Sequence, residues 1–61
     1  SSAISDYTNC INLNPNDPNA YYGRGLAKAN LEDNSGACED FRRVGELGDN
    51  NVWELIRKFC Q

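Results

Sequence analysis

Apolar side chains recur at steps of three and four residues through most of the chain, which is the spacing that gathers them on one face of an α-helix. The pattern predicts a first helix from Ala3, and Asn14-Pro15 ends it because proline cannot continue a helix. Asp17 is expected to cap a second helix with Pro18 at its first position, and this helix runs to about Leu31.

A third helix is predicted by the apolar stripe that runs from Ala37 to Leu47. The polar turn before it offers two candidate caps, Asn34 and Ser35. Gly48 follows the stripe as a residue able to take positive φ, which commonly ends a helix.

A fourth helix is predicted at the end of the chain. Asn51-x-x-Glu54 reads as a capping box, with asparagine in the cap position. Four residues form the apolar face of this helix: Val52, Leu55, Ile56 and Phe59. No segment has the alternating pattern of a strand, so the pattern predicts an all-α chain of about four helices.

The chain also resembles itself at an offset of 34 residues, without a gap. The similar pairs are Ala3 with Ala37, Asp6 with Asp40, Tyr7 with Phe41, Leu13 with Leu47, and Asn16 with Asn50. Periods of this size are typical of repeat architectures, and 34 residues is the length of the tetratricopeptide repeat.

The residues at these positions resemble the tetratricopeptide repeat (TPR) family. The family pattern has a large aromatic residue and, four residues later, a glycine in its first helix, then alanine, an aromatic residue and alanine in its second. These places are held by Tyr21, Gly25, Ala37, Phe41 and Val44, and those of a preceding second helix by Ala3, Tyr7 and Cys10. The resemblance implies an α-solenoid of antiparallel helix-turn-helix repeats.

The phase of the resemblance divides the chain into three parts. Residues 1–18 correspond to the second helix of a preceding repeat and its turn, residues 19–52 to one complete repeat, and residues 53–61 to a C-terminal capping helix. Because such arrays usually need three or more repeats, the resemblance implies a C-terminal fragment of a longer array.

The resemblance implies a non-enzymatic module that binds a peptide or a partner protein through first-helix residues. By position these are Asn19, Tyr22, Leu26 and Asn30. Tyr22 and Leu26 either line this surface or belong to the core between repeats. Arg24 and Lys28 lie one turn apart and either attract an acidic partner or form a solvated face. The alternative function is a structural cap or an oligomerisation element that has no ligand of its own.

Composition argues against most other functions. Histidine is absent, so the commonest general base and metal ligand is missing, and no catalytic residue, metal site or cofactor is predicted. The paired carboxylates Glu32-Asp33 and Glu39-Asp40 are expected on the solvated surface. A formal net charge of −3 argues against nucleic acid as a partner, and no stretch approaches the length of a membrane span.

Three cysteines carry the remaining chemistry. Cys38 and Cys60 lie at equal distances from the turn near Asp49, so an antiparallel hairpin brings them to the same end. They either form a disulfide or stay unbridged as small apolar residues, depending on a compartment that the sequence does not identify. Cys10 is expected to remain a buried thiol.

The first helix is expected to present three large side chains, Ile4, Tyr7 and Ile11, without a partner helix of its own repeat. Three such side chains exposed together favour association. We therefore expect self-association through this helix at high concentration.

Overall fold

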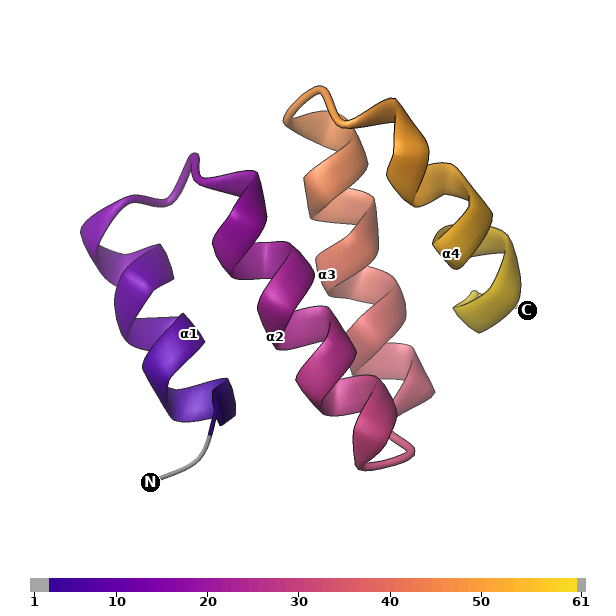
Figure 1. Ribbon diagram of the computed structural model, residues 1–61, viewed down its shortest axis with the longest axis horizontal. Coiled ribbons are helices and arrows are strands. Elements are labelled where there is room, and N and C mark those ends of the chain that lie inside the picture. Colours follow the sequence, from indigo (N-terminus) through magenta and orange to yellow (C-terminus); the bar gives the residue numbers. More distant parts are fainter. Residues whose placement is uncertain (1–2, 61) are drawn as a thin grey trace.

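The computed structural model describes residues 3–60, and in this range the chain forms four α-helices, one short 3-10 helix and no strand (Figure 1). The elements are α1 (Ala3–Leu13), α2 (Pro18–Asn30), α3 (Asn34–Glu46), η1 (Asn50–Val52) and α4 (Trp53–Phe59). The prediction of an all-α chain with about four helices is confirmed.

Aspartate side chains cap the two central helices. The Asp17 carboxylate accepts a hydrogen bond from the backbone N–H of Asn19 at 3.0 Å, with Pro18 at the first helical position as predicted. At α3 the cap is Asp33, which accepts from the N–H of Gly36 at 3.0 Å. The expectation that Asn34 or Ser35 caps this helix is wrong, because Asn34 already has helical backbone.

The start of the last helix also differs from the prediction. Gly48 does take positive φ, at 110°. Asp49 then has the extended backbone that a cap requires, and its carboxylate accepts from the N–H of Asn51 at 3.0 Å. The predicted capping box is wrong, because Asn51 lies inside η1 and no side chain caps α4.

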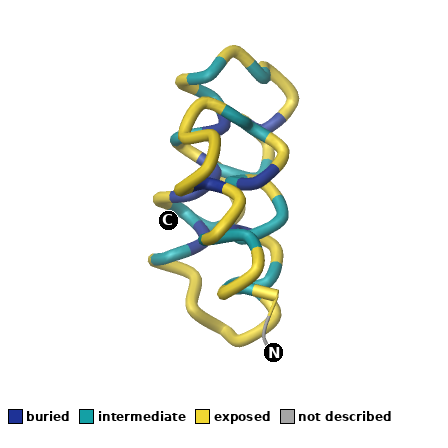
Figure 2. The backbone as a smooth tube through the Cα atoms, turned by 90° about the vertical axis from the view of Figure 1, so that its left-hand side faces the viewer, coloured by how far each residue is buried: buried dark blue, intermediate teal, exposed yellow. Residues whose placement is uncertain are grey.

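The helices pack mainly against their neighbours in the chain: α1 on α2, α2 on α3, and α3 on α4 (Figure 1). The molecule measures 28 × 25 × 13 Å, so it is flat, yet its radius of gyration of 10.5 Å is that of a compact domain of this length. Figure 2 shows that the buried residues lie within the helices, whereas the residues of the turns are mostly exposed.

The core is formed by the buried side chains of α3 together with Val52 of η1. Its fully buried members are Ala37, Phe41, Val44 and Val52, and five partly buried apolar residues surround them: Tyr21, Ala29, Leu55, Ile56 and Phe59. Gly25 of α2 lies directly against Phe41, and a Cβ atom there would lie 2.6 Å from Cε1 of the ring. The α2 and α3 helices therefore approach each other closely at Gly25.

The first helix is less exposed than the sequence predicts. Ile11 is buried, and Tyr7 is half-buried because its ring lies against Gly23 of α2. Ile4 is half-buried as well. The expectation of three large side chains exposed together is wrong, because the small residues of α2, among them Gly23 and the buried Ala20, let α1 pack closely.

Candidate functional site

An exposed stripe runs along α2 and consists of Asn19, Tyr22, Leu26 and Asn30. These residues follow one another at steps of three and four, so they share one face of the helix. Tyr22 and Leu26 are large apolar side chains, yet 37% and 39% of their surfaces stay exposed. The structure thus brings together the four first-helix residues that the sequence analysis names as a partner-binding face.

Tyr22 is held in place by the core. Its ring centroid lies 5.9 Å from that of Phe41, and Phe41 in turn lies 5.5 Å from Phe59 of α4. Tilted ring pairs at these separations are favourable aromatic contacts. Since Phe41 is fully buried, one side of the Tyr22 ring is fixed while the exposed part faces solvent.

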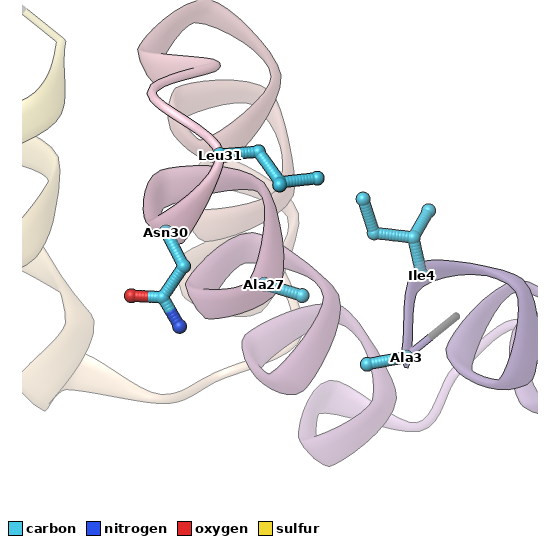
Figure 3. Close-up of a pocket in the computed structure, with 5 residues that line it drawn as sticks. All are labelled: Ala3, Ile4, Ala27, Asn30 and Leu31. Carbon is cyan, nitrogen blue, oxygen red and sulfur yellow. The ribbon is translucent and has the colours of Figure 1, made fainter. Parts of the chain in front are cut away.

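A groove of about 260 Å³ lies between the start of α1 and the end of α2. Five residues line it: Ala3, Ile4, Ala27, Asn30 and Leu31. Ile4 and Leu31 point toward one another across the groove (Figure 3), and Leu31 is 70% exposed. Asn30 also lines the groove, but its amide points away from Ile4 and Leu31 (Figure 3), so it serves the stripe as a hydrogen-bond donor and acceptor while the groove is mostly apolar.

Asp40 departs most from the sequence prediction. It was expected on the solvated surface but is only 3% exposed, because its place on α3 between Ala37 and Val44 turns it toward α2. Arg24 donates two hydrogen bonds to its carboxylate, from Nε at 2.9 Å and from the terminal nitrogen at 2.8 Å, and Lys28 Nζ lies 3.3 Å away. A two-pronged arginine–carboxylate pair of this kind is a strong, directional interaction.

The Arg24 guanidinium extends the network to α1. Its third nitrogen donates to Thr8 Oγ1 at 3.3 Å, and the Thr8 hydroxyl donates to the Ile4 carbonyl at 2.7 Å. The hydrogen bonds that Arg24 donates to Asp40 raise the pKa of Arg24 above its usual value although burial acts in the opposite direction, so the side chain stays charged.

Arg24 and Lys28 therefore neutralise a buried carboxylate of the same chain. The sequence suggested that these two residues attract an acidic partner or form a solvated face. In the structure both side chains instead pair with Asp40. The available signal was the position of Asp40 itself, three residues after Ala37 and four before Val44 on the buried stripe of α3.

The cysteines separate into a pair and a single thiol. Cys38 and Cys60 form a disulfide between α3 and the end of α4, with Cα atoms 5.1 Å apart. Cys10 is exposed rather than buried, because it lies one residue before the buried Ile11 and so is turned about 100° from the packed face of α1.

Residues 3–60 contain no cluster of three or more histidine, cysteine, aspartate or glutamate side chains that could hold a metal ion. In the same range no helix is both long and apolar enough to cross a membrane.

The chain matches no protein-family model, no curated protein and no solved structure.

Proposed function

We propose that this chain is a protein-interaction module that binds a peptide or partner protein on the exposed stripe of α2. The observation that carries the proposal is that Tyr22 and Leu26 stay more than a third exposed in the middle of a helix whose other faces are packed. Exposed aromatic and aliphatic side chains flanked by amides suit an extended peptide, whose backbone needs donors and acceptors as well as apolar contacts.

The proposal includes a TPR-like array as the setting of this surface. Three features of the chain support that setting: the 34-residue offset, the packing of each helix on its chain neighbours, and the close contact of Gly25 with Phe41. In such an array first-helix residues line one continuous surface, so the stripe would join equivalent stripes of further repeats.

The test places a photo-activated cross-linking residue at position 26 and, in a second protein, at the exposed position 39 on α3. A partner that binds the stripe is captured from position 26 and not from position 39. With the captured partner purified, we expect Asn30→Ala and Leu26→Ser to weaken binding about tenfold each, the size of one good interface contact. Glu39→Gln is the matched control and should leave affinity unchanged.

Equal capture from both positions, or unchanged affinity in both stripe variants, would refute the stripe as the binding surface. Tyr22→Ala is less suited to this test because its ring also packs on Phe41, and loss of that contact would lower stability as well.

A cap or oligomerisation element without a ligand of its own is the second candidate. It is favoured by two exposed leucines, Leu13 at the end of α1 with 88% exposure and Leu31 in the groove with 70% exposure. Sedimentation equilibrium of the isolated chain decides this candidate: a dimer that Leu31→Ser abolishes supports it, and a monomer at every concentration refutes it.

A further inference from the structure

The last helix, α4, has few features that would stabilise it in isolation. It has only seven residues, no side-chain cap, and no residue that is fully buried. Isolated helices shorter than about 12 residues are marginal in water. The order of α4 therefore depends on its contacts with the rest of the molecule.

Those contacts cover the core. Leu55, Ile56 and Phe59 lie against the buried residues of α3, and the Phe59 ring is 5.5 Å from that of Phe41. At the other end the Trp53 indole lies against Gly45. Removal of α4 would therefore uncover apolar side chains that are now completely buried.

The segment is attached at both ends. Val52, which is 1% exposed, holds the end that leads into α4. Cys60 follows the last helical residue directly and is bonded to Cys38 of α3. Both cysteines are half-buried, so the bond lies at the surface and within reach of a small thiol.

We propose that the Cys38–Cys60 disulfide is a redox-sensitive latch that holds α4 over the core of α3. A dithiol reductant transfers two electrons and two protons to the sulfur–sulfur bond, which leaves two cysteine thiols here and one disulfide in the reductant. Without the bond only half-buried side chains hold α4, so it detaches locally and uncovers the face of α3 around Phe41.

The rest of the fold does not depend on the latch. The extensive contact between α2 and α3 and the bonds from Arg24 to Asp40 involve no residue of α4. Reduction should therefore release one segment and leave the others folded.

The experiment uses the full chain with Cys10→Ser, which removes the exposed third thiol and with it disulfide exchange. Amide hydrogen exchange is compared before and after reduction with dithiothreitol. We expect exchange at residues 57–60 to become faster by up to roughly 100-fold, the effect of removing a cross-link that closes a loop of this size. Exchange in α2 and α3 should change by no more than a few-fold.

The fluorescence of Trp53 gives a second, independent measurement, because Trp53 is the only tryptophan of the chain. Its emission should shift to longer wavelength on reduction as the indole leaves Gly45. Cys60→Ser in the same background should behave as the reduced protein under all conditions and should not respond to dithiothreitol.

Equal exchange at residues 57–60 in both redox states would overturn the latch. So would an equal acceleration in all helices, since the disulfide would then stabilise the whole fold rather than hold one segment. No partner protein enters this experiment, so its outcome is independent of the function proposed for α2.

Discussion

At the scale of single residues, Asp40 is the buried charged side chain of the described chain, and its environment explains two basic residues elsewhere. Arg24 and Lys28 lie one turn apart on α2 and both reach its carboxylate. A buried carboxylate needs such partners because removing a charge from water is costly unless it is paired and hydrogen-bonded.

Asp40→Asn should destabilise the fold by about 2–3 kcal/mol. The loss of one partner of a buried ion pair commonly costs about 3–5 kcal/mol, but Arg24 and Lys28 keep about a fifth of their side-chain surface exposed and can turn toward solvent. Urea denaturation measures the change. The adjacent Glu39→Gln, at an exposed position, should stay within about 0.5 kcal/mol. An Asp40 variant as stable as that control would show the pair to be energetically neutral.

Two glycines make a matched pair for a second prediction. Gly25→Ala should destabilise by about 1–2 kcal/mol, because overpacking against the buried Phe41 ring outweighs the gain of about 1 kcal/mol in helix propensity. Gly45→Ala meets the Trp53 ring at 2.9 Å, but that ring is 46% exposed and can move. Gly45→Ala should therefore leave the stability of the fold unchanged or raise it. Thermal unfolding of both variants checks this, and equal losses would contradict it.

At the scale of elements, three helices, α2, α3 and η1, begin directly after an aspartate that caps them. The sequence predicted only one of these three caps. Asp17 was predicted because proline follows it, whereas Asp33 and Asp49 stand beside asparagines that are equally good caps. Which of two adjacent capping residues acts depends on where the chain leaves extended backbone, and tertiary packing decides that. Helix existence was thus predictable from periodicity, while helix starts were predictable only to within one or two residues.

The cap of α3 provides a test at this scale. Asp33→Ala should cost about 1 kcal/mol, because the N–H of Gly36 loses its side-chain acceptor. Asn34→Ala, one residue later and inside the helix, should change stability by a few tenths of a kcal/mol at most. Urea denaturation of the two variants separates them, and a larger loss for Asn34→Ala would restore asparagine as the cap.

The candidate site was more predictable from the sequence than its charged surroundings. The exposed stripe of α2 follows from spacing within a single helix, since Tyr22 and Leu26 lie on one face wherever that helix goes. The burial of Asp40 and the exposure of Cys10 depend on how far one helix is rotated against another. That rotation is set by contacts such as Tyr7 against Gly23, which involve residues far apart in the sequence.

At the scale of the whole molecule, a flat row of helices distributes stability unevenly. Each helix relies on its neighbours in the row, so α2 and α3 have support on two sides. The α1 helix packs mainly on α2 and contributes a single buried residue, Ile11. Local opening should therefore differ between the helices.

We expect amide exchange in the oxidised protein to be fastest in α1 and slowest in α3, by about tenfold or more. A difference in opening free energy of 1.4 kcal/mol, less than the burial of one large side chain, is enough for such a ratio. Residue-resolved hydrogen exchange by NMR measures the order. Uniform protection across the four helices would mean that the chain opens only as one cooperative unit.

The two caps at Asp17 and Asp49 have one further consequence, for how such a chain could lengthen. Their backbones are nearly superimposable, at φ −88°, ψ 105° and φ −86°, ψ 105°. A tandem copy of residues 17–48 inserted before Asp49 would therefore meet the chain at a junction whose backbone already exists. The copied helix would take the place of η1 and α4 on α3, so it would meet the Phe41 ring that Phe59 now contacts. Duplication would thus extend the row by one hairpin without redesign of the turn, while the contact surface of α3 would receive a new partner.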